Sequence, residues 1–288
     1  MDYLQQTNLG RGLHGLINNI NHGADGEQIG EDLFGVADLL RSNEPLARAI
    51  TDPSRTDTDR RSLARDLFAD VLSNAAMQSV YDLVGDRWTR PDDLATTLSV
   101  LGLDAYILAA VQDKESDTLA SQLIGAGEVI KEDRELRIQL SDLGDGTSTD
   151  RSKLAMKIFH GHVSPIAERL IGRAAASSDY GRLLQTLRSY ADRAAELNGK
   201  RLVVATTAKP LSEAQVKRME ELASRRWNTA VELVPIIDPH MLGGFKMDSG
   251  DTFVDTLGPD PSRTGLLHRI LCPRRRSRRR DWLRYRNC

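Results

Sequence analysis

An internal repeat is the feature that most constrains how this chain can fold. The segment TDRRSLARDLF at residues 58–68 recurs as TDRSKLAMKIF at residues 149–159. The identical positions are Thr58/Thr149, Asp59/Asp150, Arg60/Arg151, Leu63/Leu154, Ala64/Ala155 and Phe68/Phe159. Weaker similarity extends to both sides, so the chain is predicted to hold two copies of one unit between about residue 28 and residue 197. The alternative is that two amphipathic Leu/Ala helices resemble each other without a duplication.

Within each copy, apolar residues recur with the period of a helix. Leu63, Leu67 and Val71 are spaced by four residues, as are Leu154 and Ile158. This spacing places side chains on one face of a helix, and we expect these faces to be buried. Because aromatic residues make up only 5% of the chain, the core is expected to consist mainly of Leu, Ile, Val and Ala. Each copy is predicted to be a bundle of four to six short helices.

Capping residues predict where two helices of the second copy begin and end. Ser164 followed by Pro165 is typical of a helix N-cap with proline at the first helical position. Ser178 or Asp179 can cap the last helix of the copy. That helix is expected to end at Asn198–Gly199, since glycine readily adopts the left-handed conformation that terminates helices.

The sequence changes character after residue 200. Two short β-branched runs, RLVVATTAK and AVELVPII, flank a segment with strong helix signals. Ser212 and Gln215 have the spacing of a capping box, and Leu211 and Val216 are placed for a hydrophobic staple. The buried stripe of this helix is predicted to be Val216, Met219, Leu222 and Ala223. With GFKMDSG and TFVDTL as possible further strands, the segment predicts a small α/β domain, and the whole chain is of the α+β class.

Charge is distributed unevenly along the chain. Residues 274–288 hold eight Arg and one Asp, a charge of +7, whereas the whole chain carries −2 and the first 273 residues therefore carry −9. The two cysteines, Cys272 and Cys288, offer no disulfide framework, which fits a reducing cytoplasm. The pattern predicts neither a membrane-spanning helix nor a secretory signal. Nucleic-acid binding, if any, would depend on the basic tail alone.

Several residue clusters suggest chemistry but lack essential parts. Asp238 and His240 could act together as a general base for proton transfer, but the sequence has no nucleophile-elbow motif to go with them. His160 and His162 have no third ligand nearby for a metal. GAGE at residues 125–128 lacks the spacing of a phosphate-binding loop, and small residues for close helix packing explain it better. We therefore expect no catalytic residue, no bound cofactor and no metal.

The second half of the chain carries a specific combination of motifs. VVATTAKPLSEAQ is followed by VELVPIIDPHMLGGFKMDSGD, and this order resembles the δ subunit of F-type ATP synthase, the bacterial counterpart of the oligomycin-sensitivity-conferring protein. The residues that match the pattern of the family are Thr207, Ala208, Pro210, Leu211, Ser212, Gln215, Asp238, Pro239, Leu242, Gly243, Gly244, Gly250 and Asp251. The first copy resembles the duplicated bundle of longer, actinobacterial-type members.

The resemblance implies a division of the chain and a non-catalytic function. The expected parts are an N-terminal segment of uncertain order (1–27), a first helical repeat (28–113), a second repeat equivalent to the N-terminal domain of the family (114–199), a small α/β domain (200–258) and a divergent basic tail (259–288). A δ subunit is a stator component that couples proton flow to ATP synthesis. By resemblance, the helical bundle would bind the N-terminal helix of subunit α, and the α/β domain would meet the C-terminal end of subunit b. The location implied is the cytoplasmic face of the bacterial membrane, with peripheral attachment.

The signature residues near the end of the chain are expected to shape the backbone. Asp238–Pro239 is predicted to form a strand-ending turn in which the Asp side chain caps its own backbone. Gly243–Gly244 permits a backbone path closed to other residues, and Gly250–Asp251 is predicted to be a second turn.

The alternative to a stator function is that the chain is an adaptor or nucleic-acid-associated protein that uses its Arg-rich tail.

Overall fold

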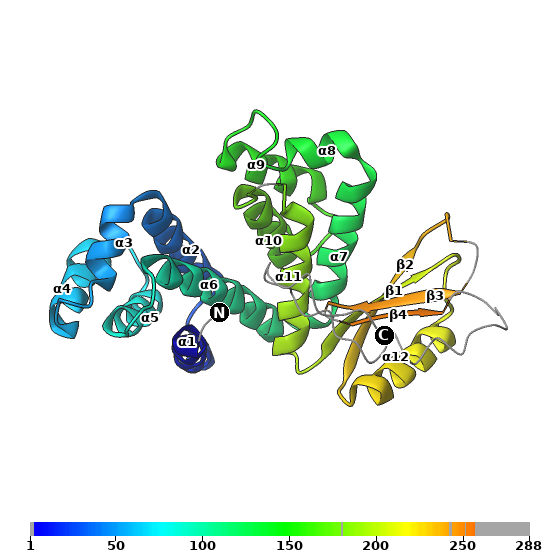
Figure 1. Ribbon diagram of the computed structural model, residues 1–288, viewed down its shortest axis with the longest axis horizontal. Helices are drawn as coiled ribbons and strands as arrows, with labels where there is room; N and C mark the ends of the chain where they lie inside the picture. The colour runs from blue at the N-terminus through cyan, green and yellow to red at the C-terminus, as the bar shows by residue number, and fades with distance from the viewer. Residues whose placement is uncertain (1–2, 180, 242–243, 251, 257–288) are drawn as a thin grey trace, which may run out of the picture. The chain divides into compact units, whose positions relative to one another are not determined.

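The chain forms a helical unit followed by a smaller unit that contains a sheet (Figure 1). The computed structural model describes residues 3–179, 181–241, 244–250 and 252–256, the last of these by backbone alone. The two compact units are Met1–Lys200 and Arg201–Cys288. Helical bundles followed by a small α/β domain were predicted, and the fold class is confirmed.

Eleven helices make up the described part of the first unit. They are α1 (Tyr3–Asn21), α2 (Gly26–Ser42), α3 (Glu44–Thr51), α4 (Asp57–Phe68), α5 (Asn74–Gly85), α6 (Pro91–Gln112), α7 (Ser116–Glu132), α8 (Arg134–Gln139), α9 (Ser148–Phe159), α10 (Pro165–Ala176) and α11 (Leu183–Leu197). We call α1–α6 the first helical group and α6–α11 the second helical group, because α6 packs against α1, α2, α3 and α5 and also against α7, α10 and α11.

The helices from α2 to α5 and from α7 to α10 have similar lengths in the same order. α2 and α7 have 17 residues each, and α4, α5, α9 and α10 have 12 each. α3 and α8 are short, with 8 and 6 residues. Equivalent hydrogen bonds also recur: the backbone N–H of Ser73 donates to the Asp32 carboxylate at 2.8 Å, and that of Ser164 donates to the Gln122 side chain at 2.8 Å. The helices in each run fall within the predicted number.

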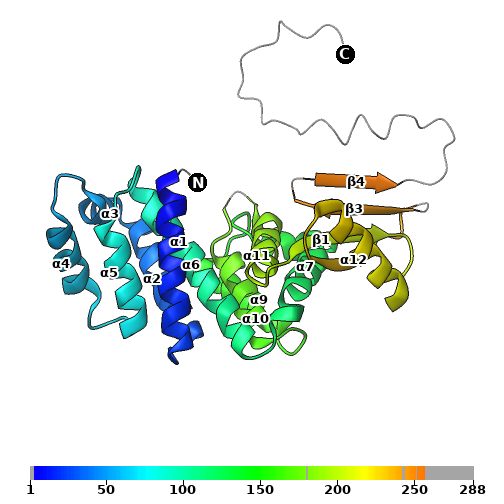
Figure 2. The same ribbon diagram turned by 90° about the horizontal axis from the view of Figure 1, so that it is seen from below.

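The first 27 residues, for which no order was predicted, contain α1. Leu16 and Ile20 are buried in the core of the first helical group, and α1 lies beside α5 and α6 (Figure 2). The side chain of Asp25 then accepts the backbone N–H groups of Glu27 and Gln28 and so caps α2. The first 27 residues therefore contribute side chains to the core of the first helical group.

The helical period of α4 and α9 was predicted correctly, but the buried face was wrong. Leu67 is 42% exposed and Val71 is 77% exposed, whereas Arg60, Ala64 and Phe68 are the buried side chains of α4. The guanidinium of Arg60 donates to the carbonyls of residues 85 and 86, which end α5. A helix C-terminus leaves carbonyls without partners inside the helix, and here they accept from the two Nη atoms of the buried Arg60.

The second helical group repeats this arrangement. Arg151 of α9 donates to the carbonyls of Ala175 and Ala176 at the end of α10, at 3.1 Å in each case. Ala155 and Phe159 are the buried residues of α9, not Leu154 and Ile158. In both groups the helix turns its arginine inward, which moves the buried stripe away from the leucines.

Predicted caps of the helical unit are partly confirmed. Ser164 caps α10 with Pro165 at the first helical position, and α11 ends with Gly199 at φ 69°. The prediction that Ser178 or Asp179 caps α11 was wrong, because α11 begins at Leu183 and its N-cap, Arg182, makes no side-chain cap. Ser178 instead lies 1% exposed beside Asp142.

α6 is apolar on all sides because helices surround it. It is long and apolar enough to cross a membrane by composition, with a mean hydropathy of 1.8, but 72% of that window is buried inside the protein. Leu94, Leu98 and Leu101 belong to the core of the first helical group, and farther along Asp104 contacts α11. In this protein the composition of α6 is that of a core helix shared by two groups.

Glycines let α2 and α6 approach closely. A Cβ on Gly30 would lie 2.5 Å from the Tyr106 ring and 3.0 Å from the carbonyl of Gly102, and a Cβ on Gly26 would lie 2.8 Å from the carbonyl of Ala105. The prediction that GAGE supports close packing was wrong, because a Cβ on Gly125 or Gly127 would meet nothing within 4 Å. The close contact of the unit lies at a different set of glycines.

The α/β unit is a four-stranded sheet with one helix on it. Its elements are β1 (Arg201–Thr207), α12 (Glu213–Trp227), β2 (Val231–Ile237), β3 (Phe245–Ser249) and β4 (Thr252–Thr256). The strand order is β2-β1-β3-β4. β1 and β2 are parallel, and β3 is antiparallel to both β1 and β4. The two further strands predicted from GFKMDSG and TFVDTL are confirmed.

The core of the α/β unit lies between α12 and the sheet. Met219 and Ala223 of α12 pack with Val203, Leu233 and Met247, and Val216 lies at the edge of this cluster. Leu222 was wrongly placed in the stripe, since it is 51% exposed. Val216, Met219 and Ala223 form the stripe of α12 that faces the narrow sheet, and Leu222 lies to one side of this stripe.

We expect Gly30→Ala to destabilise the helical unit. The new methyl group would overlap a rigid ring and a carbonyl, and overpacking of this kind costs about 1 to 3 kcal/mol. Gly35→Ala is the matched control on the same helix, because its Cβ meets nothing within 4 Å. It should stabilise by about 0.5 to 1 kcal/mol through helix propensity. Urea unfolding of both variants measures the difference, and equal stabilities would contradict the close approach of α2 and α6.

Candidate interaction sites

The signature residues after β1 form a turn and a helix cap. Thr207 is 5% exposed, and its hydroxyl donates to the carbonyl of Lys209 at 2.9 Å. Ala208 is half-buried and Pro210 is exposed. This segment carries the chain from the end of the strand to the start of α12.

The predicted capping box at the start of α12 is confirmed. The backbone N–H of Ser212 donates to Gln215 Oε1 at 2.8 Å, and the backbone N–H of Gln215 donates to Ser212 Oγ at 3.4 Å. Leu211 and Val216 are both partly buried against the core of the α/β unit. The pair thus lies where a hydrophobic staple requires it.

The Asp238–Pro239 segment forms the predicted turn at the end of β2. The backbone N–H of His240 donates to the Asp238 carboxylate at 2.9 Å, and that of Met241 donates to the Asp238 carbonyl at 3.1 Å. The backbone N–H of Asp238 itself donates to the carbonyl of Thr207 at 2.9 Å. Pro239 and His240 are exposed. The carboxylate of Asp238 therefore holds backbone and is not arranged to activate His240.

Glycine conformations complete the signature. Gly244 has φ 77° and Gly250 has φ 63°, both in the left-handed region. Gly250 joins β3 to β4, which confirms a turn at this point. Leu242, Gly243 and Asp251 lie outside the described residues.

The sheet brings the two signature segments together. Thr207 pairs with Ile237 in the parallel ladder and with Phe245 in the antiparallel one. The turn after β1, the turn after β2 and the beginning of β3 therefore meet at one edge of the sheet, whereas Gly250 lies at the far end of β3. These residues shape three chain reversals and present no convergent set of reactive groups.

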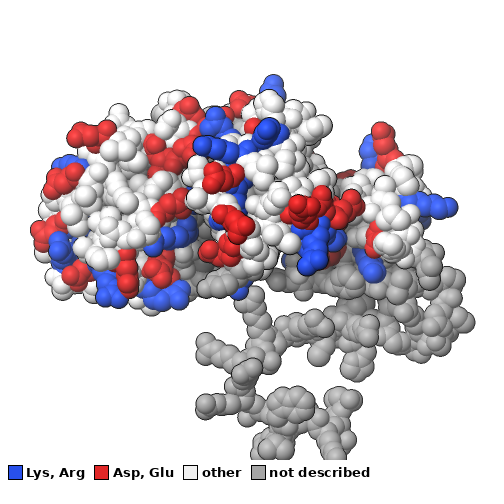
Figure 3. All heavy atoms as spheres, turned by 90° about the horizontal axis from the view of Figure 1, so that it is seen from above, with Lys and Arg blue, Asp and Glu red and all other residues white. Residues whose placement is uncertain are grey.

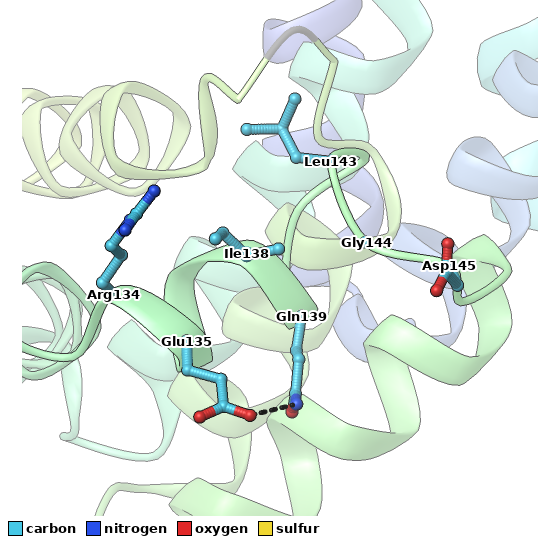
Figure 4. A pocket seen from close by; sticks show the side chains of 7 residues that line it. All are labelled: Arg134, Glu135, Ile138, Gln139, Leu143, Gly144 and Asp145. Carbon is cyan, nitrogen blue, oxygen red and sulfur yellow. Dashed lines mark hydrogen bonds between the residues drawn. The ribbon is translucent and has the colours of Figure 1, made fainter.

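A hollow beside α8 in the second helical group also lacks the features of an active site (Figure 4). Its lining residues are Arg134, Glu135, Ile138, Gln139, Leu143, Gly144 and Asp145. Gln139 Nε2 donates to Glu135 Oε1 at 3.4 Å, and Figure 4 shows Arg134 and Asp145 at opposite ends of the hollow. Leu143 is 65% exposed. Glu135 and Gln139 contact each other while Arg134 and Asp145 lie at opposite ends, so the polar groups do not converge on one point of the hollow.

The histidine pair that follows α9, His160 and His162, is not assembled into a metal site. His160 Nδ1 lies 3.0 Å from Glu168 Oε2. Among the residues that the structure describes, no group of three His, Cys, Asp or Glu side chains is placed to hold a metal ion. On the face drawn in Figure 3, acidic and basic side chains are interspersed. The Arg-rich run of residues 274–286 lies outside the described part of the chain.

A buried ion pair joins α6 to α11. Arg193 Nε and Nη2 donate to the two oxygens of Asp104 at 2.7 and 2.8 Å, and Asp104 is 0% exposed. Burial raises the pKa of Asp104, and the hydrogen bonds from Arg193 oppose that shift. Paired in this bidentate way, the carboxylate fixes how the second helical group attaches to the shared helix.

Charged residues of α2 and α10 form a second connection between the groups. Arg173 pairs with Asp38, and its guanidinium lies 4.4 Å from the centre of the Phe34 ring. Arg169 Nε lies 3.2 Å from Glu27 Oε2, and its Nη1 lies 3.9 Å from Glu31 Oε1. The sequence analysis missed both connections. A single acid in the apolar run LGLDAYILAA was a usable signal, because a carboxylate inside an apolar helix needs a buried partner.

These features define a protein built from packed helices and a small α/β unit. The model of the family described as ATP synthase delta (OSCP) subunit matches residues 104–256, from the middle of α6 to the end of β4. The ATP synthase subunit delta of Frankia casuarinae is 30% identical over 231 residues, which are 80% of this chain and 83% of that protein.

Other actinobacterial relatives are similar to the chain to the same degree. The ATP synthase subunit delta of Kineococcus radiotolerans is 30% identical over 81% of this chain and 84% of its own length. That of a Nocardioides species is 32% identical over 79% of this chain and 82% of its own length. The chain belongs to the ATP synthase delta (OSCP) subunit family. It is a non-catalytic peripheral-stalk subunit of F-type ATP synthase, and it is part of that membrane-associated complex as a peripheral component.

We expect Gly250→Val to destabilise the α/β unit by about 1 to 2 kcal/mol, because a side chain other than glycine is penalised in the left-handed region. Gly250→Asn is the matched control, since asparagine tolerates that conformation best among the larger residues. Thermal unfolding compares the two variants. ATP hydrolysis by the isolated catalytic head should be unaffected by either.

Asp104→Ala should destabilise the helical unit by about 3 kcal/mol, because the largely buried Arg193 guanidinium loses its bidentate partner. The control is Glu196→Ala, which removes the other carboxylate that contacts Arg193. Glu196 is 68% exposed, so its loss should change stability by less than about 1 kcal/mol. Urea unfolding measures both, and a small effect for Asp104→Ala would show that the pair contributes little.

Proposed function

We propose that this subunit joins the N-terminal helix of an α subunit to the C-terminal end of subunit b, at the cytoplasmic face of a bacterial membrane. The observation that carries the proposal is the unbroken family match, which runs through the second helical group and the α/β unit. A bundle of short helices with an apolar interior is a suitable receptor for an amphipathic helix. The joint would hold the catalytic head still while proton flow turns the rotor.

The mechanics of a stator favour several linked contacts over one. A joint under torque must dissociate slowly, and most differences in affinity between related complexes lie in the dissociation rate. When two contacts belong to one chain, the second forms at a high effective concentration. A chain that binds α through its helices and b through its α/β unit meets this requirement without any reactive group.

We also propose that residues 28–113 and 114–199 are copies of one bundle. The matched helix lengths support this, and so do the equivalent hydrogen bonds of Ser73 and Ser164. In this proposal α1 lies before the first copy and packs against it. α6 belongs to the first copy and also packs against helices of the second.

The signature residues have structural functions in this proposal. The signature residues from Thr207 to Asp251 would stabilise the chain reversals at the ends of β1, β2 and β3. They would thereby maintain the shape of the surface that meets subunit b. Support comes from the bonds of Thr207, Ser212 and Asp238, which all go to backbone or to capping partners. Residues 259–288, the divergent basic tail of the sequence, lie outside the described residues.

Recovery of the tagged full-length chain from native membranes, after gentle solubilisation, tests the proposal. Subunits α and b should accompany it. A variant that lacks residues 273–288 should recover both subunits as well, whereas an adaptor that binds nucleic acid through its tail would lose its partner with that deletion. Recovery of the chain without α and b would overturn the proposed function.

A further inference from the structure

The outer side of α4 leaves apolar side chains exposed. α4 packs against α5 and α3 and lies at the end of the first helical group away from α6 (Figure 2). Leu67 is 42% exposed, and Val71, in the turn that follows α4, is 77% exposed. Their spacing predicted a buried stripe, but the helices around α4 leave it open. If this stripe is to be buried, another segment must cover it.

Two acidic side chains lie beside these apolar ones. Asp66 directly precedes Leu67 and Asp70 directly precedes Val71, so the two acids are one helical turn apart. Both are exposed. Among the residues that the structure describes, neither carboxylate makes an ion pair or a hydrogen bond. We call these four residues the α4 face. It offers apolar contact together with two carboxylates available for pairing.

The equivalent positions of the second helical group have different chemistry. The internal repeat pairs Asp66 with Lys157 and Leu67 with Ile158. Ile158 is half-buried, whereas Leu67 is exposed. A general requirement of the bundle therefore does not explain the α4 face, which distinguishes the first helical group from the second.

Net charge also separates the first helical group from the rest of the chain. Residues 1–112 hold nine Arg, no Lys and 17 Asp or Glu, a charge of −8. Residues 113–200 hold 13 Lys or Arg and 14 Asp or Glu, a charge of −1. The strongly basic part of the sequence is residues 274–288, the Arg-rich segment, with a charge of +7. The charges of the first group and of this segment are therefore complementary.

The Arg-rich segment also holds apolar residues. Trp282, Leu283 and Tyr285 stand among its arginines. Arginine suits a contact with exposed acids, because its guanidinium can bind a carboxylate through two parallel hydrogen bonds. The segment therefore contains both kinds of group that the α4 face can bind.

We propose that the Arg-rich segment binds the α4 face of its own chain. Its arginines pair with Asp66 and Asp70, and its apolar residues cover Leu67 and Val71. The 17 residues from 257 to 273 form the tether between the α/β unit and the segment, and they span at most about 60 Å. A tether raises the effective concentration of the segment, so individually weak ion pairs are sufficient for the contact.

The contact limits what else the Arg-rich segment binds. A segment with eight Arg and one Asp attracts nucleic acid and anionic lipid without specificity. Pairing with the carboxylates of the first helical group makes its arginines less available to such partners. The inference does not rest on the proposed contacts with α and b.

Disulfide trapping in the full-length chain tests the contact, because the Arg-rich segment ends in a native cysteine, Cys288. In a Cys272→Ser background, Ala69→Cys places a thiol beside the α4 face at an exposed position and leaves that face unchanged. His160→Cys is the matched control, since the repeat pairs residue 160 with residue 69 and its side chain is 81% exposed. With oxidised glutathione, Ala69→Cys should form the intramolecular disulfide with Cys288 about tenfold faster than His160→Cys. Peptide mass mapping measures both.

Charge reversal at the α4 face is the second test. Asp66→Lys with Asp70→Lys, added to Ala69→Cys, should slow trapping by about fivefold or more, since two exposed ion pairs are replaced by repulsion. Asp113→Lys with Glu132→Lys changes the net charge equally at exposed positions outside α4 and should slow it much less. Salt at 1 M should also slow trapping, because the Debye length is then about 3 Å. Thermal unfolding checks that all variants remain folded.

Three results would overturn the inference. The first is equal trapping at positions 69 and 160. The second is a disulfide that joins two chains, because the contact would then require a second copy. The third is an equal loss in the two charge-reversed pairs, which would reduce the contact to overall charge. The recovery of α and b from membranes is measured separately, so the failure of this inference is distinguishable from the failure of the proposed function.

Discussion

The close approach of α2 to α6 is the constraint on which the helical unit depends. A Cβ on Gly30 would lie 2.5 Å from the Tyr106 ring and one on Gly102 would lie 3.0 Å from the Phe34 ring, so α2 and α6 approach closely at these glycines. The opposite ends and sides of α6 remain for α1, α5, α10 and α11. An apolar helix of this kind is stable in water only when other helices cover it, which explains why both helical groups share it.

The sequence predicted the helices and strands more accurately than it predicted which faces of the helices are buried. The helical period and the capping box of α12 were sufficient to predict helical bundles followed by a small α/β unit, because each signal is local. The buried faces of α4 and α9 were wrong because Arg60 and Arg151 turn inward to satisfy carbonyls at the ends of neighbouring helices. No local pattern distinguishes such an arginine from a solvated one. Sharing of α6 was missed for a similar reason, since hydropathy alone does not say which partners cover a helix.

The candidate sites also contain local features that the sequence predicted and long-range contacts that it did not. The turn at Asp238 and the left-handed Gly244 and Gly250 follow from residue chemistry that acts within a few positions, and the structure has them as predicted. In contrast, the pairs Asp104–Arg193 and Asp38–Arg173 join residues far apart in the sequence. Spacing along the chain contains no information about such partners, although the isolation of Asp104 in an apolar run shows that it needs one.

A shared helix also changes the elasticity of the protein. α6 has 22 residues and is therefore about 33 Å long at 1.5 Å per residue. Two bundles joined by a loop would flex at that loop, and part of any applied strain would be absorbed there. When a continuous ladder of backbone hydrogen bonds runs through both cores, bending one group against the other requires deforming the helix itself. The helical unit should therefore behave as one stiff body under load, with little compliance between its two halves.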